Sequence, residues 1–264
     1  MSNAFYRVLA LGDVVGPESV EKLGRLLPAL KREEHIDLTI VNGENAAAGN
    51  GLDRKSADAL FSCGVDVVTS GNHVFQKREF MTEIDTYPFL IRPANYPAGT
   101  PGREAVIFDS FGMRVLVTNV LGRVFSEPVD CPFGAIERVL AAYSGAYDLA
   151  VLDVHAEATS EKLALARYFD GRVGIVFGTH THVQTADERI LPGGTGYLTD
   201  LGMCGPVDSI LGVQADCVIA RMKSHLPTRF VTASGPTEIT GAVFTWDKAA
   251  RRCSEVSRVR RIAD

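Results

Sequence analysis

The sequence predicts an α/β fold with a mixed sheet, or with two sheets that face each other. Short apolar runs bounded by glycine or polar residues recur through the first two thirds of the chain, and helical patterns lie between several of them. Strands that alternate with helices of this length form βαβ units and a largely parallel sheet. Paired β-rich runs in the middle and at the end of the chain require antiparallel pairing as well.

Five apolar runs are expected to be buried strands. They span residues 7–11, 38–41, 65–69, 149–154 and 173–177. Two helices are expected between the first three runs. Residues 17–34 have leucines on one face, and residues 53–63 begin with a capping Asp53 and are followed by Gly64.

Antiparallel pairs are expected in three places. Residues 105–108 and 114–119 flank a hairpin-like connection, and a similar pair flanks 192–194. The tail from 229 to 261 is expected to form strands with a turn at 246–248. Because the chain shows no low-complexity linker and no internal repeat, we expect one domain over residues 1–264.

The composition is that of a folded globular protein and excludes several classes of function. Lys and Arg number 27 against 32 Asp and Glu, so the formal charge of −5 offers no basic field for an extended nucleic-acid surface. The apolar start, 5–11, is too short for a signal-peptide core or a membrane span. The five cysteines form no C-x-x-C pair. We therefore expect a cytoplasmic protein without a membrane partner.

Chemistry-bearing side chains follow all five apolar runs. In open α/β sheets the carboxyl ends of the strands meet at one edge, so these side chains can converge although they are far apart in sequence. The candidates are Asp13, Glu44, Asn45, Asn72, His73, His155, His180 and His182. Alone, Asp13, Asn45 and Asn72 would most often be capping or turn residues and His155 a hydrogen-bonded histidine at a strand end, whereas His180 and His182 would be ligands as often as not. Their coincidence at five strand ends indicates an active site.

The candidate set contains only nitrogen and oxygen donors. Such donors suit Mn, Fe or Zn with five or six ligands better than a tetrahedral structural zinc. The set is too large for one ion, whereas two ions roughly 3.5–4 Å apart, bridged by a carboxylate, would use it fully. Many phosphatases and nucleases have this arrangement.

Ordered sequence blocks resemble those of the calcineurin-like metallophosphoesterases. The blocks are Gly12-Asp13, Gly43-Glu44-Asn45, Gly71-Asn72-His73, His155 and Gly178-Thr179-His180-Thr181-His182. Longer segments at 42–45, 92–97, 155–162 and 179–187 resemble the YmdB-like bacterial branch of this superfamily. Two departures from the broad pattern are typical of that branch. Asp13 is not followed by x-His, and Glu44 replaces the usual bridging aspartate.

The resemblance implies a fold and an assignment of ligands. The fold is a four-layer α/β/β/α sandwich of two mixed sheets. The cofactors are two divalent or transition metal ions, with iron or manganese favoured and zinc as the alternative. The first ion would be held by Asp13, Glu44, Asn45 and His182, and the second by Glu44, Asn72, His155 and His180, so that Glu44 bridges. His73 would lie beside the ions as a catalytic acid.

The resemblance further implies an enzyme that hydrolyses cyclic nucleotides, with 2′,3′-cyclic nucleoside monophosphates favoured. Metal-activated hydroxide would attack phosphorus in line, and His73 would protonate the departing oxygen. Two alternatives remain: a metal-dependent nucleotide or RNA-associated regulator, and a phosphomonoesterase with incidental diesterase activity. The partner is then a small phosphodiester, and a homo-oligomer is also expected.

Contacts to the rest of the substrate are harder to assign from sequence. Arg92, Asn95 and Arg123 lie between the ligand blocks, where they would contact phosphate or sugar or else form ordinary surface ion pairs. Phe75, Tyr96 and Phe125 are candidates for stacking on a base, but aromatic side chains more often belong to the core.

Overall fold

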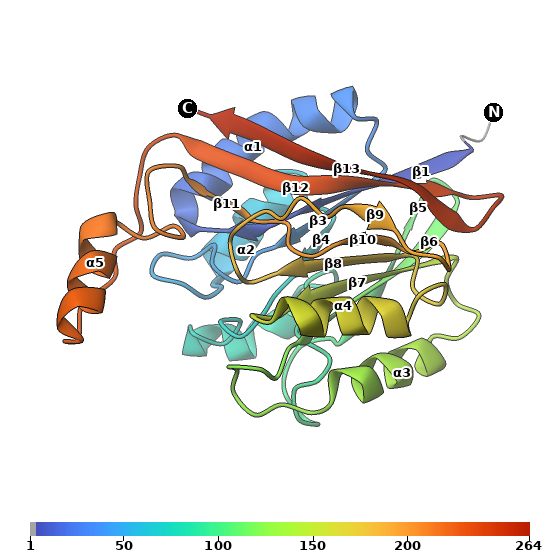
Figure 1. Ribbon diagram of the computed structural model, residues 1–264, viewed down its shortest axis with the longest axis horizontal. Coiled ribbons are helices and arrows are strands. Elements are labelled where there is room, and N and C mark those ends of the chain that lie inside the picture. Colours follow the sequence, from blue (N-terminus) through green and yellow to red (C-terminus); the bar gives the residue numbers. More distant parts are fainter. Residues whose placement is uncertain (1–3) are drawn as a thin grey trace.

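The computed structural model describes residues 4–264, which form two facing β-sheets with helices on both outer sides (Figure 1). The first sheet has the order β2-β11-β12-β1-β3-β4, with β13 paired to β12, and the second has the order β5-β6-β7-β8-β10-β9. Both are mixed, since β1-β3-β4 and β6-β7-β8 run parallel while β12 pairs with its neighbours β1, β11 and β13 antiparallel. The expected four-layer architecture is confirmed.

In the first third of the chain, strands β1, β3 and β4 and both helices match the sequence expectations closely. The first sheet contains β1 (Phe5–Leu11), β2 (Asp13–Val14), β3 (Leu38–Asn42), β4 (Val67–Thr69), β11 (Met203–Pro206), β12 (Thr237–Asp247) and β13 (Arg252–Ala263). Helices α1 (Gly16–Glu33) and α2 (Arg54–Ser62) cover its outer face. Asp53 caps α2 as expected, because its carboxylate accepts from the Ser56 amide at 2.8 Å.

The second sheet contains β5 (Ala105–Ser110), β6 (Met113–Leu121), β7 (Leu149–His155), β8 (Ile175–Thr179), β9 (Arg189–Ile190) and β10 (Gly196–Leu198). The expected hairpins are present, because β5 pairs with β6 and β9 with β10 in antiparallel fashion. Helices α3 (Pro132–Ala142) and α4 (Thr159–Tyr168) pack on its outer face. Two short 3₁₀ turns, Arg78–Thr82 and Ile84–Thr86, and the helix α5 (Ala215–Ser224) complete the described chain.

Successive side chains of each strand point to opposite faces of the sheet, and this alternation builds separate cores between the sheets and beneath the helices. In β1, Val8 and Ala10 enter the core between the sheets, while Leu9 and Leu11 enter the core beneath the helices. Val151 of β7 faces the first sheet, whereas Leu152 faces α3 and α4. Each inner strand is buried on both faces, which is why these runs are continuously apolar in the sequence.

The expectation for the tail is wrong in two details. The turn lies at 248–251, later than expected, because β12 continues through Asp247 and the Asp247 carboxylate accepts from the amides of Ala249 and Ala250. Residues 229–236 form a loop with one isolated bridge, between Thr232 and Val213, rather than a strand. Among the described residues, no helix combines the length and apolar character required to cross a bilayer.

Candidate metal centre

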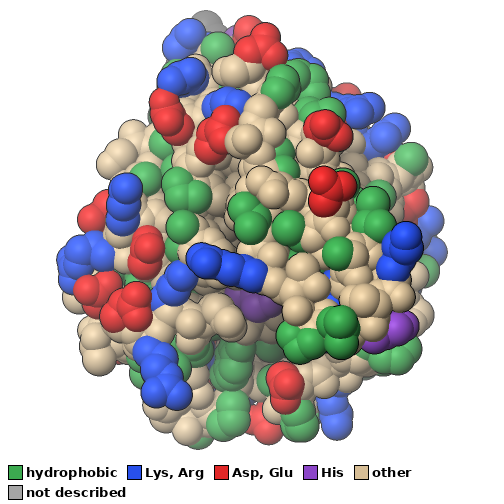
Figure 2. Space-filling model, turned by 90° about the vertical axis from the view of Figure 1, so that its left-hand side faces the viewer, with side chains coloured by type: hydrophobic (Ala, Val, Ile, Leu, Met, Phe, Trp, Pro, Cys, Tyr) green, Lys and Arg blue, Asp and Glu red, His purple; other side chains and the backbone are tan. Residues whose placement is uncertain are grey.

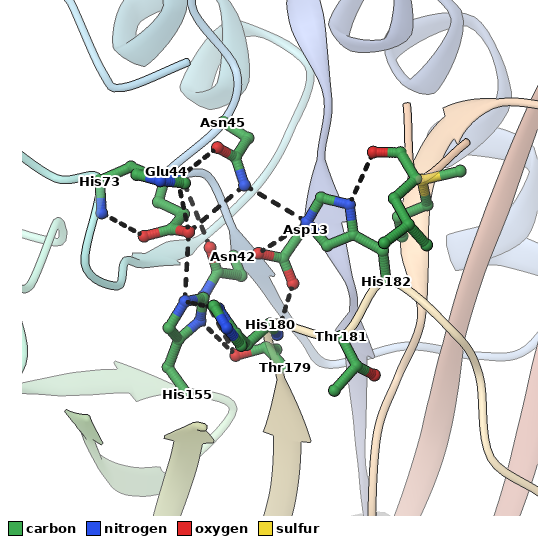
Figure 3. Close-up of polar contacts among 12 residues, drawn as sticks. Asp13, Asn42, Glu44, Asn45, His73, His155, Thr179, His180, Thr181 and His182 are labelled. Atoms are coloured by element: carbon green, nitrogen blue, oxygen red, sulfur yellow. Dashed lines mark hydrogen bonds and ion pairs between the residues drawn. The ribbon is translucent and has the colours of Figure 1, made fainter. Parts of the chain in front are cut away.

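The carboxyl ends of β1, β3, β4, β7 and β8 meet at one end of the molecule, where the candidate residues lie together (Figure 3). Glycines allow this close approach. A Cβ at Gly71 would lie 2.3 Å from Glu44 Oε2 and from His155 Nε2, and one at Gly12 would lie 2.1 Å from the Gly202 carbonyl oxygen. Figure 2 views this end and shows a histidine near the centre of the face.

One group of ligands surrounds the Nε2 atom of His155. This atom lies 3.1 Å from Glu44 Oε1, 3.0 Å from Asn72 Oδ1 and 3.1 Å from His180 Nδ1. Nitrogen and oxygen atoms of Glu44, His155 and His180 all lie within 4.8 Å of one another. The convergence of a carboxylate, an amide oxygen and two imidazole nitrogens is the donor set of a divalent transition metal.

The opposite side of each imidazole is held by a second partner. Nδ1 of His155 lies 2.9 Å from the Thr179 hydroxyl, which donates at 2.7 Å to the buried carboxylate of Asp153. Nε2 of His180 lies 3.3 Å from Glu157 Oε2, and Nδ1 of His182 lies 3.1 Å from the Leu211 carbonyl oxygen. Such contacts fix the ring and leave the other nitrogen for a metal.

A second group of ligands lies around Asp13. Its carboxylate is completely buried, and Oδ1 has no hydrogen-bond partner within residues 4–264. His182 Nε2 lies 3.6 Å from this oxygen and 3.4 Å from the Asn45 amide nitrogen. An orphaned buried carboxylate oxygen is costly without a partner, and a cation would supply one. The residues present therefore fit a second metal ion.

Glu44 lies between the two groups. Its Oε1 atom is 3.1 Å from His155 Nε2 and 3.3 Å from the Asn45 amide nitrogen. In this structure Asn45 turns Nδ2 toward Glu44 and His182, and Oδ1 toward His73. Metal coordination by Asn45 requires its amide oxygen, so the amide group must rotate when an ion binds there.

The charges of the centre are strongly coupled. Burial opposes ionisation of Glu44 and Asp13, but His155 and His182 respectively hold the pKa of each carboxyl below its usual range. Burial likewise opposes protonation of His155, yet the charge of Glu44 raises its pKa to about 9. Burial and the neighbouring His155 lower the pKa of His180 to about 4. The carboxylates are thus ionised near neutral pH and His155 carries a proton, while Asp13 raises the pKa of His182 against the effect of burial.

His73 lies at the edge of this cluster. Its amide donates to Glu44 Oε2 at 2.8 Å, and its Nδ1 is 2.9 Å from Asn45 Oδ1 and 3.3 Å from Glu44 Oε1. The side chain is about one third exposed and lines a cavity of about 300 Å³. The other wall residues include Asn50, Glu157, Leu211 and Thr232. His73 is therefore placed beside the metal ligands and open to a bound molecule.

The loop that carries His180 and His182 is held in a strained conformation. Their φ angles are 96° and 63°, in the left-handed region that side chains with a Cβ rarely adopt. Thr181, between them, donates from its hydroxyl to Asp200 Oδ2 at 2.8 Å. Sequence reasoning missed Asp200, although it follows β10 in the same way that the other candidates follow their strands.

The three residues expected to contact substrate are not presented to the cavity. Arg92 is 3% exposed, and its guanidinium donates to the carbonyls of Pro93, Thr100 and Pro101 and to Glu104. Asn95 is 1% exposed and binds the backbone of Leu121 and Asp130. Arg123 is exposed, but it does not line the cavity. Interior polar groups need partners, and the fold itself supplies them for the first two.

Two of the three aromatic candidates are accounted for by the fold. Phe75 and Tyr96 pack edge to face, with ring centroids 6.0 Å apart, against the core beneath α1 and α2. Phe125 is 92% exposed and does not line the cavity.

Comparisons with known proteins agree with this geometry. The model of the family described as YmdB-like protein matches residues 9–259. A Bacillus subtilis protein named 2′,3′-cyclic-nucleotide 2′-phosphodiesterase is 45% identical over 253 residues, which cover 96% of each chain. A crystal structure of a novel phosphatase from Mycoplasma pneumoniae is 32% identical, with a TM-score of 0.93, and the match covers 100% of this chain and 95% of that one.

A second solved structure, of a hypothetical protein from Thermus thermophilus, is 40% identical with a TM-score of 0.91. That match covers 98% of this chain and all of the Thermus chain.

Proposed function

Because the chain belongs to the YmdB-like protein family and is a phosphoesterase, we propose that it hydrolyses 2′,3′-cyclic nucleotides with two bound metal ions, iron or manganese being favoured. One observation carries the proposal. Glu44 joins two convergent sets of ligand atoms, those around His155 and those around Asp13, whose Oδ1 accepts no hydrogen bond from the described residues and has His182 Nε2 at 3.6 Å. The name of the Bacillus relative supports the choice of substrate.

The ligands divide into two sets with Glu44 in common. Asp13, Asn45 and His182 would complete the first set, and Asn72, His155 and His180 the second. Two divalent ions held there would supply an activated water as nucleophile and neutralise the phosphate oxygens.

His73 has the remaining chemical role. Hydrolysis forms a bond from water oxygen to phosphorus and breaks the bond from phosphorus to O2′, so that the departing O2′ requires a proton. Nδ1 of His73 is engaged by Asn45 and Glu44, whereas Nε2 has no hydrogen-bond partner within the described part of the chain. We assign to Nε2 the proton that is transferred to O2′.

The proposal is tested with the purified, full-length protein loaded in turn with Mn²⁺, Fe²⁺ or Zn²⁺. The substrates are 2′,3′-cyclic AMP, 3′,5′-cyclic AMP, bis-p-nitrophenyl phosphate and the monoester p-nitrophenyl phosphate. We expect the highest kcat/KM with 2′,3′-cyclic AMP. Absence of diester hydrolysis with every metal would refute the proposal, and a preference for the monoester would assign the site to phosphomonoesters.

A further inference from the structure

A groove begins beside the cavity of the metal centre. It has a volume of about 320 Å³ and is lined by Pro17, Ala48, Gly49, Arg229, Phe230 and Thr232, among others. Thr232 also lines the metal cavity, and Gly49 of the groove is followed by Asn50 of the cavity. The two hollows are therefore neighbours at one end of the molecule, where α5 projects from the sheets in Figure 1.

The groove carries one unpaired cation. Arg229 is exposed, and its guanidinium makes no hydrogen bond or ion pair with any of residues 4–264. Guanidinium groups bind phosphate oxygens well, because their fixed fork of donors matches two acceptors at once. Arg229 therefore offers a binding site for an anion in the groove.

The other residues that line the groove suit the flat ring of a nucleotide base. Phe230 is 51% exposed, and Pro17, Ala48 and Gly49 bring no charged group. A Cβ at Gly49 would meet no atom within 4 Å, so the space above this backbone is open. Proteins hold single-stranded nucleotides by stacking their bases on aromatic rings and placing a cation at the phosphate.

The side of the metal cavity that opens past Thr232 into the groove differs in charge from the rest of the cavity wall. The carboxylate of Glu157, which is half exposed, stands in another part of the cavity wall and would repel a phosphodiester. The larger cavity between α1 and α2, of about 600 Å³, is lined by Glu21, Asp53 and Lys55, and it shares no lining residue with the metal cavity. The passage over Thr232 has no acidic side chain and leads to Arg229.

We propose that this groove binds the nucleotide that precedes the cyclic phosphate, so that the substrates include RNA fragments ending in a 2′,3′-cyclic phosphate. Arg229 binds the internal phosphodiester and Phe230 stacks on the preceding base. The proposal rests on the proposed function, and the reaction is the same. Water adds to phosphorus, the bond to O2′ breaks, O2′ takes up a proton, and the fragment keeps a 3′-phosphate.

The test compares adenosine 2′,3′-cyclic phosphate with the dinucleotide ApA ending in a 2′,3′-cyclic phosphate, using the metal-loaded full chain. Stacking of one base predicts a kcat/KM about tenfold higher for the dinucleotide. Arg229→Gln and Phe230→Ala should each bring the ratio of the two kcat/KM values close to one. Lys223→Gln, which removes an exposed cation of α5 outside the groove, should keep the ratio of the wild type.

A ratio near one in the wild type, or a ratio unaffected by Arg229→Gln, would overturn the proposal. Self-association that depends on Phe230, combined with such a ratio, would instead assign the groove to a contact between copies.

Binding of the products ApAp and Ap, measured by calorimetry, decides the question without turnover. Tighter binding of ApAp that is lost in Arg229→Gln supports the groove, even if neither cyclic substrate is hydrolysed and the proposed function fails. Equal binding of the two products overturns the groove.

Discussion

The ammonium group of Lys162 lies 2.6 Å from Asp200 Oδ2, and neither side chain is more than 1% exposed. Burying two charges is costly, so such a pair persists only with further hydrogen bonds. Here the same carboxylate oxygen accepts from the Thr181 hydroxyl, and Asp200 Oδ1 accepts from the Gly202 amide. The pair thus anchors the loop in which His180 and His182 hold left-handed conformations.

Replacement of Thr181 by valine tests whether this anchor positions the metal ligands. We expect a protein that folds but binds Mn²⁺ about 10–100-fold more weakly, because partners of ligand residues have effects of this size. Thr199→Val is the matched control, since its hydroxyl binds Asp187, which contacts no ligand histidine. Calorimetric titration of metal-free protein measures both. Equal Mn²⁺ affinities in the two variants would reduce the anchor to a structural role.

Glu44→Gln tests the bridge. The change keeps the shape of the side chain but removes the charge shared by both ligand sets, so metal content should fall from two ions per chain to one or none, and turnover should be lost. Atomic absorption measures the first effect and circular dichroism checks the fold. Two retained ions with full activity would show that Glu44 does not bridge.

His73→Ala tests the acid. Both ions should remain, while kcat for 2′,3′-cyclic AMP should fall by about 10²–10⁴-fold. The loss should be smaller with bis-p-nitrophenyl phosphate, whose leaving group needs no proton. If the variant instead loses metal, His73 is a ligand and the assignment is wrong.

Metal binding should depend on pH through His155. Its pKa is raised from 6.5 to about 9 in the metal-free centre, so an incoming ion must displace this proton. Affinity for Mn²⁺ should therefore rise with pH between about 6.5 and 9, by up to about tenfold per unit for one displaced proton, and level off above. Calorimetric titrations across this range test the expectation, which an affinity independent of pH would contradict.

Arg92→Met tests the structural assignment of Arg92. Removing the guanidinium leaves the buried carbonyl oxygen of Pro93 and the partly buried carbonyl oxygens of Thr100 and Pro101 without this donor. A buried unsatisfied group costs about 1–3 kcal/mol, so the free energy of unfolding should decrease by about this amount. Urea unfolding measures the loss. KM for 2′,3′-cyclic AMP should not change. A selective rise in KM would instead show that Arg92 contacts the substrate.

Local patterns in the sequence predicted much of the fold. The apolar runs at 7–11 and 38–41 became β1 and β3, because a strand buried on both faces must be apolar throughout. Asp53 and Gly64 correctly marked the ends of α2. Helices α3, α4 and α5 were not singled out. For α4 the reason is that its apolar residues form only a weak stripe.

The candidate metal centre was predictable because its residues share one local property, a position directly after a buried strand. Parallel strands bring their carboxyl ends to the same edge whatever the details of packing. Asp13 and His182, 169 residues apart, could therefore be expected to meet before any contact was known.

Contacts between segments that share no such rule were decided by the tertiary structure alone. Arg92 and Asn95 have the chemistry of substrate ligands, but packing encloses them with backbone carbonyls that take up their donors. Lys162 lies on α4 and Asp200 follows β10, and only the packing of α4 against the second sheet makes them a pair. The sequence by itself thus determined which side chains could bind metal. Three-dimensional packing decided which polar groups are left unsatisfied, and therefore which remain free to bind.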